Sequence, residues 1–90
     1  MDDIEKKVRE RIGAYARVEP DKIQPGAELM RQLGVSSLDM LKMLAELEHH
    51  YQVTIPDDEL VTMTTPEHIA AKIREILKAR AQPDTTETAT

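Results

Sequence analysis

Apolar residues recur at the three- and four-residue spacing of an α-helix in three separate stretches of this 90-residue chain. The spacing predicts helices over residues 2–15, 37–51 and 66–81. Residues 52–55 could form a strand, but Pro56 would end it and no partner strand accompanies it, so we interpret them as a connector. The apolar positions that define the three helices are Ile4, Val8, Ile12 and Tyr15; Leu38, Leu41, Leu44, Ala45, Leu47 and Tyr51; and Ile69, Ile73, Ile76 and Leu77.

The signals at the helix ends agree with these ranges. Ser36 is a good N-cap for the second helix, with Asp39 at the third helical position, and Thr65 followed by Pro66 is typical of a helix start. Residues 57–61 begin with acids and predict one short helical turn. We therefore expect an all-α fold, a small bundle of three main helices plus one short helix, over residues 1–81. Residues 82–90 are rich in threonine and lack apolar anchors, which predicts a disordered C-terminal tail.

The connection between the first two helices, residues 17–35, is long for a compact domain. Pro20, Pro25, Gly26 and Gly34 punctuate it. Four apolar residues predict that it is held against the core, with a helical turn near residues 27–32, and a long loop of this kind tends to be functional. These four anchors are Ile23, Leu29, Met30 and Leu33.

Composition excludes several classes of protein. The chain has no Cys, Phe or Trp, so disulfides and thiolate metal sites are excluded, and the core must consist of Leu, Ile, Val, Met and Ala. No apolar run approaches the roughly 20 residues of a membrane span, and no signal-peptide pattern occurs, so we expect a cytoplasmic protein. Residues 36–63 hold six acids and one base and so carry the whole net charge of −5. This acidic segment disfavours nucleic acid and suits basic protein partners.

The chemistry concentrates where the long connection meets the second helix. Gly34, Ser36, Ser37 and Leu38 place a glycine, a cap and a second hydroxyl at a helix start. The N–H groups of the first turn have no intrahelical partner there, so a phosphate esterified to Ser37 would be stabilised. We expect Leu38 to anchor the turn, with the hydroxyl of Ser37 pointing outward. A serine at this place is more often only a cap, so these residues alone leave both interpretations open.

The same segment, Leu33-Gly34-Val35-Ser36-Ser37-Leu38-Asp39, resembles the prosthetic-group motif Gly-x-Asp-Ser-Leu of acyl and peptidyl carrier proteins. The resemblance extends over residues 4–77 and includes residues 18–23 and 29 before the motif, and residues 53, 55–58 and 65–66 after it. The motif serine corresponds to Ser37. The motif aspartate is replaced by Ser36, which caps a helix comparably but removes a negative charge and adds a second hydroxyl.

The resemblance implies that a phosphopantetheinyl transferase joins 4′-phosphopantetheine from coenzyme A to Ser37, and that the arm carries acyl groups as thioesters between enzymes. It implies partners such as acyl-transferring enzymes, ketosynthases or ligases, in fatty acid or polyketide biosynthesis, and a protein that is a substrate and not itself an enzyme. It also implies docking on the second helix. Lys42 and His49 replace acids that are common in the family, so we expect a specialised carrier. The expected docking residues are Leu38, Asp39, Lys42, Glu48 and His49.

Alternatives remain at this stage. The chain could be an aminoacyl or peptidyl carrier, or an unmodified helical interaction domain in which Ser37 is structural. His49 and His50 point about 100° apart on a helix, so we predict no metal site. Met40, Met43 and Met63 could line an acyl cleft, although core filling is the more ordinary role of methionine. We expect a monomer that binds neither nucleic acid nor membrane.

Overall fold

The computed structural model describes residues 3–81, and within that range it contains helices, turns and loops but no strand. The predicted all-α bundle of three main helices and one short helix is confirmed, with one additional 3₁₀ turn. The proposed tail over residues 82–90 lies outside the described residues. The elements are α1 (Asp3–Ala16), η1 (Pro20–Lys22), α2 (Ser37–Tyr51), α3 (Asp57–Leu60) and α4 (Pro66–Ala81).

The main helices begin and end close to where their sequence signals place them. α2 spans the predicted residues, and α4 starts at Pro66 as predicted, where the Thr65 hydroxyl accepts a hydrogen bond from the His68 N–H at 3.2 Å. α1 ends one residue later than predicted, and α3 ends one residue earlier. Gln52 ends α2 in the left-handed conformation, and Arg80 of α4 donates to the carbonyl oxygen of Gln52. Local capping therefore determines these boundaries.

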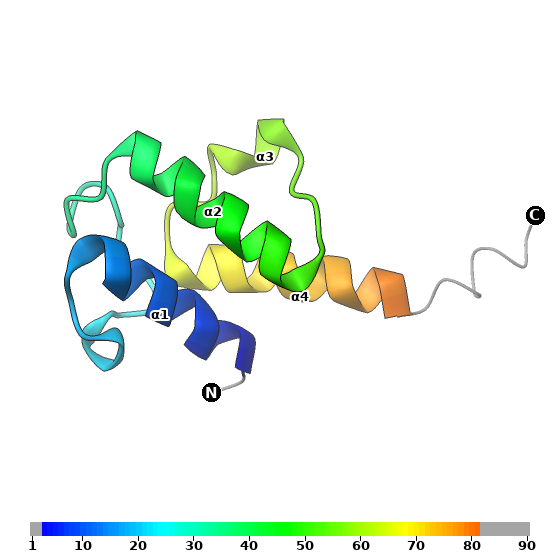
Figure 1. Ribbon diagram of the computed structural model, residues 1–90, viewed down its shortest axis with the longest axis horizontal. Helices are drawn as coiled ribbons and strands as arrows, with labels where there is room; N and C mark the ends of the chain where they lie inside the picture. Colours follow the sequence, from blue (N-terminus) through cyan, green and yellow to red (C-terminus); the bar gives the residue numbers. More distant parts are fainter. Residues whose placement is uncertain (1–2, 82–90) are drawn as a thin grey trace, which may run out of the picture.

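The three long helices pack around a single apolar core. α1 contacts both α2 and α4, and α3 lies on the far side of the bundle from the start of α1 (Figure 1). An ion pair between Lys72 of α4 and Glu59 joins α3 to the bundle. The core contains the aliphatic and methionine side chains that the composition requires: Val8, Ile12, Ile23, Leu29, Val35, Met40, Met43, Leu44, Leu47, Ile55, Met63, Ile69, Ala70 and Ile73.

The buried face of α2 is only partly the face predicted from its apolar residues, because Leu44 and Leu47 are buried as predicted but Ala45 is exposed. Met40 and Met43 are buried beside Leu44 and Leu47, whereas Leu38 and Leu41 are 61% and 53% exposed. The prediction that Leu38 anchors the first turn is therefore wrong. Apolar residues surround most of this helix, so its spacing admits two different faces, and packing against α1 and the long loop selects the one that contains the methionines.

The long first loop is held in place by both side chains and backbone. Ile23 and Leu29 are buried as predicted, but Met30 is exposed, which corrects its assignment as an anchor. The Leu29 N–H donates to the Thr64 carbonyl at 3.0 Å, and the Pro25 carbonyl accepts from the Glu67 N–H at 3.0 Å. The predicted helical turn is present as two bonds of helical spacing, Gln32 to Glu28 and Leu33 to Leu29, but it is shifted slightly along the chain. These contacts bring the loop to the start of α2.

Candidate functional site

The start of α2 is organised by Ser36 and not by the hydroxyl that follows it. The Ser36 hydroxyl accepts a hydrogen bond from the Asp39 N–H at 3.1 Å, and the Ser36 carbonyl accepts from Met40 at 2.9 Å. The predicted N-cap is therefore confirmed. Gly34 precedes it at φ +73°, a left-handed conformation that glycine adopts without strain, and a Cβ there would meet no heavy atom within 4 Å. The chain thus turns sharply into the helix and leaves open space beside the turn.

Ser37 is the first residue of α2, and it is exposed. Its hydroxyl has no hydrogen-bond partner among residues 3–81, in contrast to the hydroxyl of Ser36. As a first-turn residue it lies where helix N–H groups lack intrahelical acceptors and the helix dipole is positive. The structure therefore places an exposed serine, whose hydroxyl is not engaged within the described residues, beside an electropositive helix end. This geometry fits an esterified phosphate, which needs an accessible oxygen and nearby donors.

An apolar groove of about 310 Å³ opens beside Ser37. It lies between α2, the turn of the long loop and the segment at the end of α3. Ser37 contributes to its wall, so a group attached there can reach the groove directly. Of the three methionines considered for a cleft, Met43 and Met63 only fill the core, whereas Met40 is buried and also faces the groove. The other apolar lining residues are Met30, Leu41, Leu44, Leu60 and Val61.

Two other features of the described residues do not compete with this site. A hollow of about 360 Å³ between α1 and η1 is lined by Lys6, Glu10 and Asp21, among others, and has no hydroxyl that could be modified. Within residues 3–81, no group of three or more histidine and acidic side chains could hold a metal ion. The groove beside Ser37 is the hollow to whose wall the Ser37 side chain contributes.

The five residues predicted to contact partners all lie on α2, but their environments differ. Leu38, Lys42 and His49 are exposed. Asp39 is half-buried near the N-cap. Glu48 is also half-buried, and its carboxylate accepts a hydrogen bond from the Ile55 N–H at 2.6 Å. Glu48 therefore holds the connector after α2 in place, which leaves it less available to a partner than its sequence position suggested.

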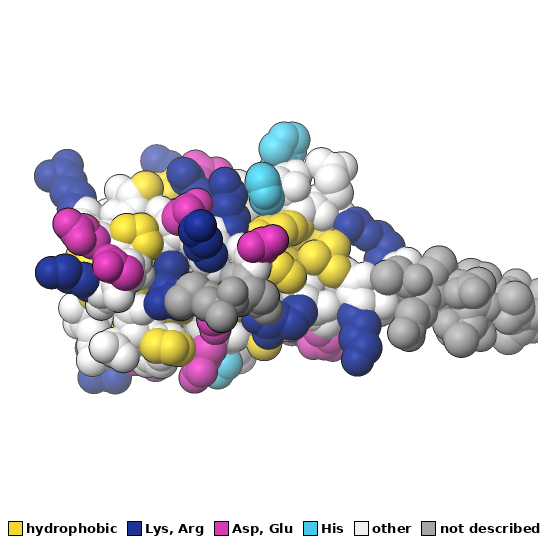
Figure 2. Space-filling view, turned by 90° about the horizontal axis from the view of Figure 1, so that it is seen from below, with side chains coloured by type: hydrophobic (Ala, Val, Ile, Leu, Met, Phe, Trp, Pro, Cys, Tyr) yellow, Lys and Arg dark blue, Asp and Glu magenta, His cyan; other side chains and the backbone are white. Residues whose placement is uncertain are grey.

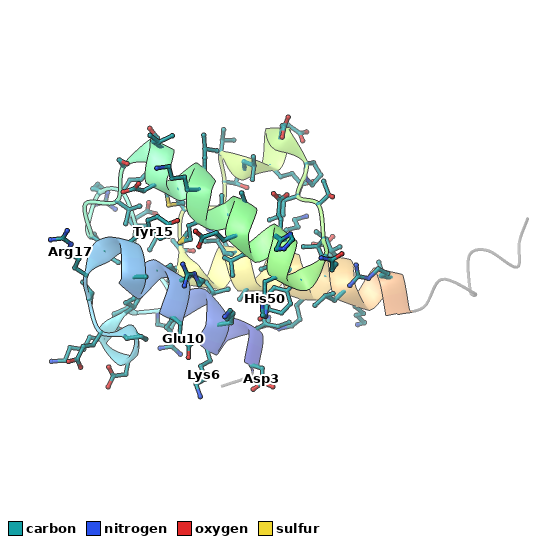
Figure 3. The ribbon with its side chains drawn as sticks, viewed as in Figure 1. Asp3, Lys6, Glu10, Tyr15, Arg17 and His50 are labelled. Atoms are coloured by element: carbon teal, nitrogen blue, oxygen red, sulfur yellow. The ribbon has the colours of Figure 1, made fainter. Side chains whose placement is uncertain are left out.

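Sequence reasoning did not find the cluster that joins α1 to α2. The Glu46 carboxylate accepts from the Arg11 guanidinium at 2.6 and 3.1 Å and from the Tyr15 hydroxyl at 2.6 Å. Figure 3 shows Tyr15 pointing from α1 toward α2. The partners are 31 to 35 residues apart in the chain, so no local pattern reveals them.

The same cluster shifts the pKa values of Glu46 and Tyr15. The hydrogen bond from Tyr15, followed by that from Arg11, lowers the pKa of Glu46 below its ordinary value. The hydrogen bond to Glu46 is also the main reason that the pKa of Tyr15 is raised. Both shifts have one cause, because a short bond from a neutral phenol to an ionised carboxylate favours that pair of protonation states. Glu46 is therefore held as an anion that is already partnered within the molecule.

Charge on the rest of the surface is mixed. On the face shown in Figure 2, basic and acidic side chains are interspersed, with hydrophobic side chains between them. None of the described helices is long and apolar enough to cross a bilayer.

Comparison with known families agrees with the geometry of this site. The model of the family described as "Phosphopantetheine attachment site" matches residues 6–86. Because the match covers most of the chain, the protein belongs to this family of phosphopantetheine-binding carrier proteins, whose members carry 4′-phosphopantetheine covalently on a serine. The family is generally non-catalytic, and its members interact with phosphopantetheinyl transferases and biosynthetic enzymes. The resemblance seen in the sequence is thereby confirmed at the level of the family.

The residues at the start of α2 fit the family's prosthetic group. A serine ester of 4′-phosphopantetheine needs one accessible hydroxyl, room for the phosphate and a backbone that can accept its charge. The exposed Ser37 meets the first need, and the open space beside Gly34 meets the second. The N–H groups of Ser37 and Leu38, which have no acceptor within the helix, meet the third, whereas the Asp39 N–H is already capped by Ser36.

Proposed function

We propose that this chain is an acyl carrier protein whose Ser37 bears the 4′-phosphopantetheine arm. The observation that carries this assignment is the difference between two adjacent serines. The Ser36 hydroxyl is used to cap α2, whereas the Ser37 hydroxyl is exposed and makes no hydrogen bond within the described residues. Modification of Ser36 would remove a cap, and modification of Ser37 would not.

In the loading reaction the chain supplies the nucleophilic oxygen and a prepared place for the product. A transferase brings coenzyme A, the Ser37 oxygen forms a bond to phosphorus, and the pyrophosphate bond breaks to release adenosine bisphosphate and the hydroxyl proton. The first-turn N–H groups of α2 then lie near the new phosphodiester. Once bound, the arm supplies a thiol that holds an acyl group as a thioester. The chain itself remains a substrate of other enzymes.

The cargo we propose is an acyl group, in a fatty acid or polyketide pathway. The groove beside Ser37 supports this choice, because its walls are apolar and the aliphatic part of a cargo would be removed from water there. An aminoacyl or peptidyl cargo is more polar and would gain less from such a groove. Leu41 and Val61 are exposed at its edge, so NMR signals of these two residues should shift when holo protein is acylated with a medium-length chain. Unchanged signals would argue for a polar cargo.

We further propose that enzymes dock on α2 beside the arm, through a set that includes Leu38, Asp39, Lys42 and His49, and that the carrier is specialised for its own pathway. Lys42 supports specialisation, because it is an exposed base on the segment that otherwise holds acids. We expect the protein to act as a monomer in the cytoplasm.

Intact mass spectrometry tests the carrier function. Wild-type protein incubated with coenzyme A and a broad-specificity phosphopantetheinyl transferase should gain the mass of one phosphopantetheine group. Ser36→Ala should also gain it, and Ser37→Ala should not. An unmodified wild type would favour the alternative of a structural interaction domain, and a fully modified Ser37→Ala would refute the assignment to this residue.

A further inference from the structure

The outermost ridge of α2 carries no carboxylate. Residues 38, 42, 45 and 49 follow one another at spacings of four, three and four, so they form one line along the helix, opposite the buried face. All four are exposed. The line, which we call the outer ridge, consists of Leu38, Lys42, Ala45 and His49.

The three acids of α2 lie beside this ridge, and two of them are engaged within the molecule. Glu46 is bound to Arg11 and Tyr15. Glu48 is bound to the Ile55 N–H. The third acid, Asp39, is half-buried and lies two helical turns before Glu46, which places it on the side of α2 that faces α1. By contrast, Lys42 forms no ion pair with any carboxylate in residues 3–81. The net charge offered by the outer ridge is therefore positive, although the segment that contains it is acidic.

Exposed apolar surface is concentrated at the same end of the helix. Within the described residues, the large hydrophobic side chains that remain exposed are Leu38, Leu41, Met30 and Val61. Leu38 follows Ser37 directly, and the other three line the groove to which Ser37 also contributes. An exposed apolar cluster next to a functional group is typical of a surface that another protein covers. With the arm on Ser37, this surface is the part of the chain nearest to the arm's point of attachment.

We propose that the enzyme that acts on the loaded arm binds the outer ridge with an apolar hollow that receives Leu38 and a carboxylate that pairs with Lys42. This inference rests on the carrier function proposed above and specifies the partner's surface. The acidity of residues 36–63 predicted a basic partner, whereas the outer ridge predicts an acidic group at this contact. Exposed acids do occur on α3, at Asp57 and Asp58, but they belong to a different element. Charge complementarity along α2 therefore selects an acidic contact.

Charge reversal at Lys42 tests the sign of this contact. The probe is an enzyme of the source organism chosen because it acylates the wild-type holo protein, with KM and kcat measured separately. Lys42→Glu should raise KM about fivefold, and Lys42→Ala about twofold, because an attraction is replaced by repulsion or is removed. The value of kcat should stay within about a factor of two, since the reacting thioester is untouched. Leu38→Ala should raise KM as well.

Lys78→Glu is the matched control. Lys78 is an exposed lysine on α4, so its reversal changes the net charge by the same amount away from the ridge. The inference requires a larger KM for Lys42→Glu than for Lys78→Glu, with circular dichroism confirming that both variants are folded. A basic partner would instead give Lys42→Glu the lower KM, and equal values would mean that Lys42 is not contacted. Either result overturns the inference and leaves the carrier function intact. That function fails separately, if wild-type protein never acquires the arm.

Discussion

The two faces of α2 contain similar residues and have different roles. Its inner face presents Met43, Leu44 and Leu47 to the core, where they are at most 2% exposed. Its outer face presents Leu38 and Leu41 to solvent at more than half of their area. The helix therefore uses leucine in two ways: on one face to stabilise the fold, and on the other to offer an apolar surface next to Ser37.

The difference between the two faces indicates which face of α2 other proteins can contact. Substitutions on the inner face act through packing and should affect every property of the protein together. Substitutions on the outer face leave the core intact and should affect only encounters with enzymes. Substitutions on the outer face can consequently change which partners the chain contacts without changing its fold.

The largest effect we predict separates two leucines on the same helix. Leu47→Ala removes a fully buried side chain and should lower the free energy of unfolding by about 2–5 kcal/mol. Leu38→Ala removes one that is 61% exposed and should change it by no more than about 0.5 kcal/mol. Urea unfolding followed by circular dichroism measures both. Equal losses would mean that the two faces are not distinct in the way described.

A smaller effect should separate the adjacent serines. Ser36→Ala removes the acceptor of the Asp39 N–H and should lower the free energy of unfolding by about 1 kcal/mol. Ser37→Ala breaks no hydrogen bond in the described structure and should change it by a few tenths of a kcal/mol at most. Thermal unfolding of the unmodified variants provides the measurement. If Ser37→Ala were the more damaging change, its hydroxyl would have a structural role that the fold does not show.

The smallest effect lies at the edge between the two faces, where Glu46 binds α1. The folded-state pKa of Glu46 is lower than its ordinary value of 4.5. The ionised carboxylate therefore stabilises the fold at pH values above 4.5, and this contribution is lost as the pH falls through the lowered pKa. The raised pKa of Tyr15 has the opposite consequence. Its contribution is present below the ordinary value of 10.0 and is lost as pH rises through the raised pKa.

The variant Glu46→Gln tests the predicted loss of stability at both low and high pH. The stability difference between wild type and this variant should be largest near neutral pH and should shrink toward both extremes. Unfolding measured across pH provides the check. Glu10→Gln, on α1, is the control for loss of one negative charge without loss of these hydrogen bonds (Figure 3). A difference for Glu46→Gln that stays constant with pH would show that the Tyr15–Glu46–Arg11 contacts do not form in solution.

Much of the fold could be predicted from the sequence because its determinants are local. Ser36 and Thr65 cap the helices that follow them, and the range of α2 was predicted correctly. The short turn η1 was not predicted, since three residues beginning at Pro20 give too little periodic signal. The buried face of α2 was predicted only in part, because Leu38 and Leu41 are as apolar as Leu44 and Leu47, which are buried. Only tertiary packing distinguishes them.

The candidate site also has features that local sequence predicts and features that depend on the tertiary structure. Ser37 and its place at the helix start could be predicted from the motif and the cap. The groove could not, because it is formed by segments distant in sequence, such as Met30 and Val61, whose exposure depends on the whole fold. The engagement of Glu46 by Arg11 could not be predicted either, since the two are 35 residues apart. Which acids remain available to partners therefore became apparent only from the structure.

The central claim is that the side-chain oxygen of residue 37 bears the arm, and fragmentation mass spectrometry of the modified wild-type protein tests it most directly. A peptide that spans residues 32–42 should yield fragments that place the phosphopantetheine mass on Ser37, with Ser36 unmodified. Fragments that place the added mass on Ser36 would contradict the account, because they would put the arm on the hydroxyl that caps α2.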